Sequence, residues 1–208
     1  MTSGHIPLPG SDRQLNWSVA HKTKQAGQAS GDGYLISRNT RSVLFAVADG
    51  SGSGKPAAAV TETCLAVLGS QGELGLQDGF TQCHRVLKGS RGAALGMILI
   101  DVQSSRFSWA AVGDVDGLLV RAAEDQPNET LIQRGGVLGV SLPRLHPSDH
   151  VMQPDDLIVM TSDGVKRAYR AHVRAGASAD RTAADVMDRF AHPRDDSIVL
   201  AISMGRVR

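Results

Sequence analysis

The sequence is poor in cysteine and in aromatic residues, and neither sign of charge is in excess. Of its 208 residues, 2 are cysteines and 4% are aromatic. Two cysteines are too few for a disulfide framework, and Cys64 and Cys83 do not form the Cys-x-x-Cys pair of a zinc site. We therefore expect both thiols to be reduced and buried in helical segments.

The charge balance and the absence of long apolar runs exclude further classes. The formal net charge is +1, whereas nucleic-acid-binding domains carry a basic excess and acidic disordered tails a large negative one. No run reaches the roughly 18 apolar residues that span a bilayer, and residues 1–11 lack the hydrophobic segment of a signal peptide. We expect a cytoplasmic monomer with a flexible N-terminal arm over residues 1–11 and one domain over residues 12–208.

Short apolar runs bounded by turn residues predict many strands. Because consecutive strands follow one another without helices between them, the pattern favours antiparallel sheets and an α+β fold with helices layered on sheets. Strands are expected at residues 15–20, 33–36, 42–48, 93–102, 106–112, 117–122, 129–134, 157–161 and 197–203. Helices are expected at residues 57–68, 76–87, 165–173 and 179–191.

Aspartates stand at the ends of five of these strands. An ionised carboxylate beside a core is costly unless it is hydrogen-bonded or bound to a metal. Asp-Gly is also an ordinary turn sequence, so each aspartate taken alone is better explained as a turn residue. Their recurrence at strand ends favours a shared site for Mg²⁺ or Mn²⁺, which prefer oxygen ligands, and the lack of histidine in these turns is evidence against zinc. The aspartates are Asp32, Asp49, Asp114, Asp163 and the pair Asp195 and Asp196.

A glycine-rich segment over residues 50–55 offers a competing interpretation, because it resembles part of a nucleotide-binding P-loop. That loop needs a glycine where Asp49 stands and a serine or threonine where Pro56 stands. A nucleotide-binding enzyme is therefore the weaker alternative. We expect the glycines to let the backbone turn tightly beside Asp49 into a helix that begins near Pro56.

Taken in order, six short segments resemble the metal-dependent protein phosphatases (type 2C). The resemblance runs from about residue 15 to the end of the chain and is strongest to the compact bacterial branch of sporulation and stress phosphatases. It implies a four-layer α-β-β-α sandwich of two antiparallel sheets flanked by helices, and hydrolysis of phosphoserine or phosphothreonine. The segments are Ser30-Gly31-Asp32, residues 48–54, Gly113-Asp114, residues 135–139, residues 161–165 and Asp195-Asp196.

The resemblance also implies a two-metal centre of Mn²⁺ or Mg²⁺, with Asp49 and Asp163 as the central catalytic residues. Asp49 would bridge both metals, and the carbonyl of Gly50 would bind the second. Asp163 and Asp195 would hold the first metal, and Asp32 would contribute directly or through water. Metals arranged in this way activate a water that attacks phosphorus directly, with no phosphoenzyme intermediate.

Some positions in this scheme stay open. Asp114, together with Asp163, would hold a weaker third metal, and Asp196 could substitute for Asp195. Lys22 or Lys24 could bind the substrate phosphate, or both could be ordinary solvated lysines. Ser53 stands where many relatives carry a histidine that could act as a general acid. The lack of this histidine puts the rate of the reaction in doubt more than the type of reaction.

The implied substrate is a phosphorylated bacterial signalling protein, either a stressosome scaffold or an anti-sigma antagonist. The alternative is a non-catalytic module that has the phosphatase fold and binds a phosphoprotein, but the complete set of aspartates favours an enzyme. No nucleic acid or membrane is expected as a partner. A basic cluster after Asp163 is either a solvated helix face or a docking surface for an acidic partner: Lys166, Arg167, Arg170 and Arg174.

Overall fold

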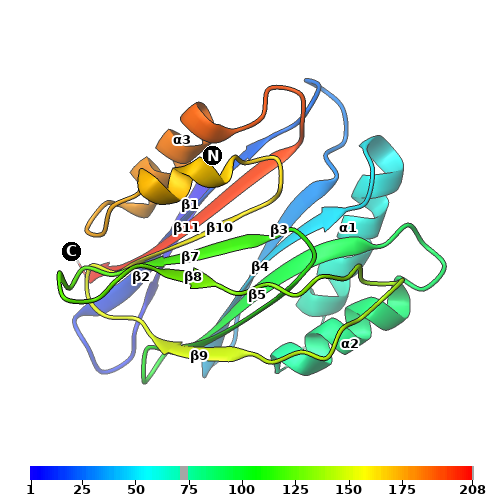
Figure 1. Ribbon diagram of the computed structural model, residues 1–208. Coiled ribbons are helices and arrows are strands. Elements are labelled where there is room, and N and C mark those ends of the chain that lie inside the picture. Colours follow the sequence, from blue (N-terminus) through cyan, green and yellow to red (C-terminus); the bar gives the residue numbers. More distant parts are fainter. Residues whose placement is uncertain (71–74, 208) are drawn as a thin grey trace.

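The chain folds into two antiparallel sheets packed face to face, with helices on both outer faces (Figure 1). The computed structural model describes residues 1–70 and 75–207, so residues 71–74 and 208 of the expected domain lie outside the described part. One sheet has the strand order β1-β2-β11-β10-β7-β8 and the other the order β3-β4-β5-β6-β9. The expected α-β-β-α sandwich is confirmed.

The elements follow the predicted order closely. The first sheet contains β1 (Thr2–Pro7), β2 (Arg13–Lys22), β7 (Asp116–Val120), β8 (Glu129–Leu131), β10 (Leu157–Thr161) and β11 (Ser197–Arg206). The second contains β3 (Asp32–Arg38), β4 (Ser42–Gly50), β5 (Ala93–Asp101), β6 (Arg106–Val112) and β9 (Ser148–Val151). Helices α1 (Gly54–Gly69) and α2 (Leu76–Val86) cover the second sheet, and η1 (Arg167–Ala171) and α3 (Ala179–Phe190) cover the first.

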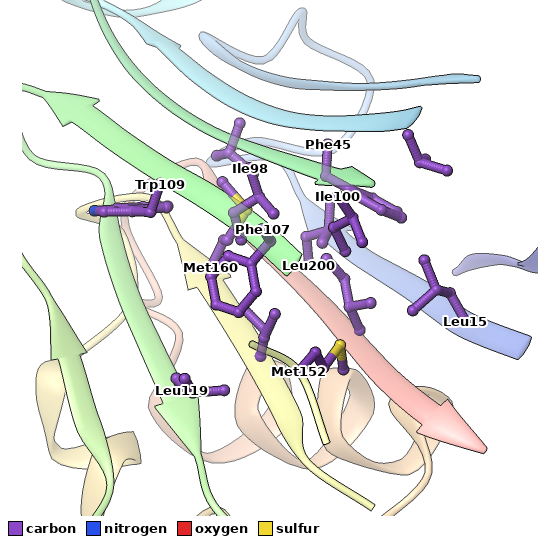
Figure 2. Close-up of a cluster of buried hydrophobic side chains, with 14 of the residues drawn as sticks. Leu15, Phe45, Ile98, Ile100, Phe107, Trp109, Leu119, Met152, Met160 and Leu200 are labelled. Carbon is purple, nitrogen blue, oxygen red and sulfur yellow. The ribbon is translucent and has the colours of Figure 1, made fainter. Parts of the chain in front are cut away.

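The central strands are buried on both faces. Phe45 of β4 lies between the sheets with Ile98 of β5 and Leu200 of β11 (Figure 2), whereas its neighbour Ala46 packs on the helix side. Strands covered on both faces have continuous apolar runs instead of alternating ones. This is why the sequence shows these strands so clearly.

The N-terminal segment corrects one expectation. Residues 2–7, expected within a flexible arm, form β1 and pair with β2 from Thr2 opposite Val19 to Pro7 opposite Gln14. Ile6 is 6% exposed, and Leu8 beyond the strand is also buried. The expectation was wrong for these residues because an edge strand with one buried side chain has no alternating pattern to detect.

The helix expected over residues 165–173 is also shorter than predicted. Only Arg167–Ala171 is helical, as the short 3₁₀ helix η1, and its Tyr169 is buried against the first sheet. The Tyr169 hydroxyl donates a 2.7 Å hydrogen bond to Asp116 of β7. This contact with a distant strand holds the segment in place, and local helical spacing does not encode it.

The two thiols match their expectation. Cys64 in α1 and Cys83 in α2 are both buried and free, and the Cys83 thiol lies 3.5 Å from the Cys64 carbonyl oxygen. They pack the two helices together under the second sheet. In residues 1–70 and 75–207, no helix is long and apolar enough to cross a membrane.

Candidate active site

Strand ends from both sheets enclose an acidic cavity of about 270 Å³. The second sheet contributes Asp32 at the start of β3 and Asp49 near the end of β4, and the first contributes Asp163, two residues beyond the end of β10. The structure thus brings together every aspartate singled out in the sequence. The complete wall consists of Asp32, Asp49, Ser51, Gly52, Ala94, Gly113, Asp114, Gly136, Val137, Asp163, Asp195 and Asp196.

Asp49 is the central carboxylate of this cavity. It is paired directly with Asp32 across β3 and β4, and it lies within hydrogen-bonding reach of the Asp32 and Asp163 carboxyl groups. Burial, followed by the negative charges of Asp32 and Asp163, raises the pKa of Asp49 to about 8. Like charges held this close are unfavourable unless a proton or a cation lies between them.

Asp32 lies deeper than Asp49. It is 5% exposed, and it accepts a 2.6 Å hydrogen bond from the Ser162 hydroxyl. Burial raises its pKa to about 7 in spite of that hydrogen bond, and the charges of Asp196, Asp163 and Asp195 add to the shift. Burial also raises the pKa of Asp163, with further contributions from Asp195 and Asp114.

The donor set fits a hydrated divalent cation. All its charged groups are carboxylates, the ligands that Mg²⁺ and Mn²⁺ prefer, and bound cations would relieve the repulsion that adds to the effect of burial on these pKa values. Within the described ranges, no three of these side chains are arranged to hold a metal ion by themselves. A cation here would keep several water ligands, as Mg²⁺ usually does in proteins.

The two adjacent aspartates before β11 have different surroundings. Asp196 is buried, and its two oxygens accept hydrogen bonds from the backbone amides of Lys24, at 2.7 Å, and Gly31, at 2.8 Å. Asp195 is exposed at the cavity wall. Asp196 thus fixes the loop before β3, and the assignment of Asp195 as the metal ligand stays a prediction.

Gly50 ends β4 where α1 packs against the sheet. A Cβ atom at this position would lie 2.2 Å from the Ala57 carbonyl oxygen, so only glycine fits. The Gly50 amide donates to the Gly31 carbonyl oxygen at 3.0 Å, and the Thr61 hydroxyl of α1 donates to the same oxygen. These contacts hold the backbone around Asp32 and Asp49 against α1.

The two candidate lysines have exposed side chains, and neither is among the described residues that line the cavity. Lys22 pairs with Ser197 at the end of β2. Lys24 reaches the site only through its backbone amide, which binds Asp196. A role for either lysine in binding phosphate stays a prediction.

The basic cluster after Asp163 is largely engaged within the molecule. Arg170 forms an ion pair with Asp116, and the Arg167 guanidinium lies 3.7 Å from the same carboxylate. Arg174 donates to the carbonyl oxygens of Ala171, the last residue of η1, and of Val173, which lies beyond it. The Arg167 and Arg170 guanidinium groups thus fasten η1 to β7, but Lys166, Arg167 and Arg174 are exposed, so the choice between a solvated face and a docking surface stays open.

Sequence reasoning missed several residues that act on the cavity. Ser162 and Thr61 do so through the hydrogen bonds described above, and Ser162 stood unnoticed beside Asp163 in residues 161–165. Arg91, in the loop between α2 and β5, lies against the Ser51–Gly52 wall, and no sequence pattern marks it. In the part of the chain that the structure describes, no histidine lines the cavity.

Comparisons with known proteins agree with this geometry. A family model described as "Stage II sporulation protein E (SpoIIE)" matches residues 39–205, well over half of the chain. The phosphoserine phosphatase RsbX of Bacillus subtilis (strain 168) is 24% identical over 101 residues, which are 49% of this chain and 51% of that protein. The matched region thus spans about half the length of this curated relative.

Two solved structures share the fold. One, described as "The bacterial stressosome: a modular system that has been adapted to control secondary messenger signaling", is 26% identical, with a TM-score of 0.80, and the match covers 90% of this chain and 98% of that one. The other is RsbX in complex with magnesium, with 17% identity and a TM-score of 0.82, over 97% of this chain and 99% of that one.

Proposed function

Since the chain belongs to the stage II sporulation protein E (SpoIIE) family, we propose that it is a metal-dependent phosphatase that hydrolyses phosphoserine or phosphothreonine on a bacterial signalling protein. The observation that carries this proposal is the convergence of aspartates from both sheets on one cavity. These carboxylates raise one another's pKa values, and a structural role alone gives no reason to gather them.

The proposed ligand set assigns each carboxylate a position around two cations, Mn²⁺ or Mg²⁺. Asp49, the central group, would bridge them, the Gly50 carbonyl would bind the second, and Asp163 and Asp195 would hold the first. Asp32, which is more deeply buried than Asp49, would contribute directly or through water, and exposed Asp114 together with Asp163 would hold a weaker third cation. When bound, the cations supply positive charge to the phosphate oxygens and lower the pKa of a water that acts as the nucleophile.

The protein's own groups fix and shape this site. Ser162 orients Asp32, the amides of Lys24 and Gly31 orient Asp196, and rigid strand ends carry Asp49 and Asp163. Asp114 and Asp163 are exposed, which leaves the cavity accessible from outside to a phosphorylated segment of another protein. Ser53 begins α1 without a side-chain capping bond and has no group suited to protonating a leaving alkoxide at neutral pH.

For the substrate, we propose a phosphorylated stressosome scaffold or anti-sigma antagonist. Support comes from the phosphoserine phosphatase activity in the name of the Bacillus relative and from the stressosome structure that shares this fold. The nucleotide-binding alternative gains no support, because Lys55 is exposed and Asp49 faces the cavity that a P-loop would need for phosphate.

The test is hydrolysis of p-nitrophenyl phosphate and of phosphoserine peptides, with and without Mn²⁺, by the wild type and by Asp49→Asn. We expect metal-dependent turnover that the substitution lowers by at least about a hundredfold. Asp125→Asn, an exposed aspartate in the turn before β8, is the charge-matched control and should leave the rate unchanged. If the wild type turns over neither substrate but binds a phosphopeptide, the protein is instead a non-catalytic module that binds phosphoproteins.

A further inference from the structure

The acidic cavity poses an electrostatic problem for its proposed substrate. Its lining contains carboxylates from both sheets and, among the described residues, no lysine or arginine. A phosphate monoester carries close to two negative charges at neutral pH. Bound cations would neutralise part of this charge, but phosphate oxygens that point away from them still need hydrogen-bond donors.

Arg91 lies against the part of the cavity wall that follows Asp49 in the sequence. Its Nη1 atom lies 3.4 Å from the Ser51 carbonyl oxygen, and a Cβ atom on Gly52 would lie 2.5 Å from the same Nη1. Both Ser51 and Gly52 line the cavity. Gly52 has a φ of +105° and no side chain, so it leaves the space that the guanidinium occupies.

The backbone holds Arg91 at this position. The Ser51 amide donates a 2.9 Å hydrogen bond to the Gly92 carbonyl oxygen, which ties the loop after Asp49 to the loop that carries Arg91. Gly92 in turn lies against the 137–138 backbone, where a Cβ atom would come within 2.5 Å of the Leu138 carbonyl oxygen. The loop therefore has little freedom to carry Arg91 away from the rim.

The Arg91 guanidinium is also uncommitted. Arg167 and Arg170 have carboxylate partners, but within the described ranges no carboxylate lies at ion-pair distance from Arg91. Among the described residues, its hydrogen bond to the Ser51 carbonyl leaves most of its N–H donors without a partner. A guanidinium presents these donors as a planar fork that matches two oxygens of a phosphate group.

We propose that Arg91 binds the phosphate group of the substrate from the loop side of the cavity, an inference that rests on the proposed phosphatase function. Arg91 then supplies the positive charge that the lining lacks, and it contacts oxygens that the cations do not reach. The role falls to Arg91 and not to Lys22 or Lys24, because the Arg91 guanidinium lies against the wall residues Ser51 and Gly52, and no contact among the described residues places either lysine side chain there.

The test compares Arg91→Ala, Arg91→Lys and the control Lys88→Ala, which removes the same charge from an exposed residue of the same loop. Steady-state kinetics are measured with p-nitrophenyl phosphate and a phosphoserine peptide in Mn²⁺. For Arg91→Ala we expect kcat/KM to fall about tenfold or more, mainly through KM, and inhibition by inorganic phosphate to weaken by a similar factor. Arg91→Lys should recover part of the loss, and Lys88→Ala should behave as the wild type.

A binding measurement separates failure of this inference from failure of the function. Inorganic phosphate with Mg²⁺ should raise the thermal midpoint of the wild type and of Lys88→Ala, but not that of Arg91→Ala. If the wild type is inactive but shows this pattern, the proposed function fails and Arg91 still binds phosphate. If the wild type is active and Arg91→Ala matches it in kcat/KM and in phosphate inhibition, the Arg91 inference is overturned and the phosphatase function stands.

Discussion

At the scale of single residues, the cavity depends on hydrogen bonds that reach its carboxylates from behind. Ser162 is the most connected of these residues, because its hydroxyl donates to Asp32 and also accepts the Ile198 amide at 3.1 Å. Groups that orient metal ligands in this way commonly contribute to metal affinity as well as to folding. A substitution of Ser162 should therefore change both the stability of the fold and the affinity of the site for metal.

We predict that Ser162→Ala lowers the free energy of unfolding by about 1–2 kcal/mol, because it leaves the buried Ile198 amide and Asp32 without their partner. It should also weaken Mg²⁺ binding. The measurements are urea denaturation and calorimetric titration. Ser18→Ala is the matched control, since the Ser18 hydroxyl is buried and, in the described part of the chain, has no hydrogen-bond partner. Equal losses from the two substitutions would contradict the prediction.

Which site residues the sequence could reveal depends on how local their signal is. Asp49 and Asp163 follow buried apolar runs directly, so their position at strand ends could be predicted from neighbouring residues. Ser162 and Asp32 are 130 positions apart, and Gly31 and Asp196 are 165 apart. Such partners meet only through the fold, so only the family resemblance favoured Asp195 over Asp196, and no local pattern marked Arg91.

At the scale of elements, the strands that sequence reasoning found and missed differ in burial. β4, β5, β10 and β11 have apolar residues on both faces and were all predicted. β1 and β9 are edge strands: β1 buries one side chain, and β9 buries none. Edge position alone does not hide a strand, because the edge strands β3 and β8 were predicted; β1 and β9 depend on backbone pairing and bury too few side chains to show an apolar pattern.

A substitution in β1 tests whether this edge strand contributes to the fold. Ile6→Ala should lower the free energy of unfolding by about 2 kcal/mol, because Ile6 packs in the core between the sheets. His5→Ala, at the exposed neighbouring position, should have little effect. Urea denaturation of both variants gives the comparison, and a neutral Ile6→Ala would restore the flexible arm that the sequence led us to expect.

At the scale of the whole molecule, carboxylates from the two sheets interact electrostatically across the cavity. Asp32 and Asp49 belong to one sheet, and Asp163 and Asp195 flank strands of the other. Without cations, the folded state holds protons on Asp32 and Asp49 up to about pH 7 and 8, whereas their ordinary pKa is 3.8. A carboxyl whose pKa is raised on folding destabilises the native state as pH rises from its unfolded value to its folded value.

We therefore predict that the thermal midpoint of the protein in a chelator falls as the pH is raised from about 5 to about 8, and that Mg²⁺ or Mn²⁺ restores it most strongly at the upper end. Asp49→Asn removes the central charge, so in chelator it should unfold about 5 °C above the wild type near pH 8, and it should gain little from added metal. The measurement is circular dichroism melting, with Asp125→Asn as the control that should follow the wild type. We expect metal to stabilise the contact between the two sheets because the carboxylates around Asp49 repel one another. An Asp49→Asn variant that is no more stable than the wild type near pH 8 would show that this repulsion does not destabilise the metal-free fold, and would contradict the prediction.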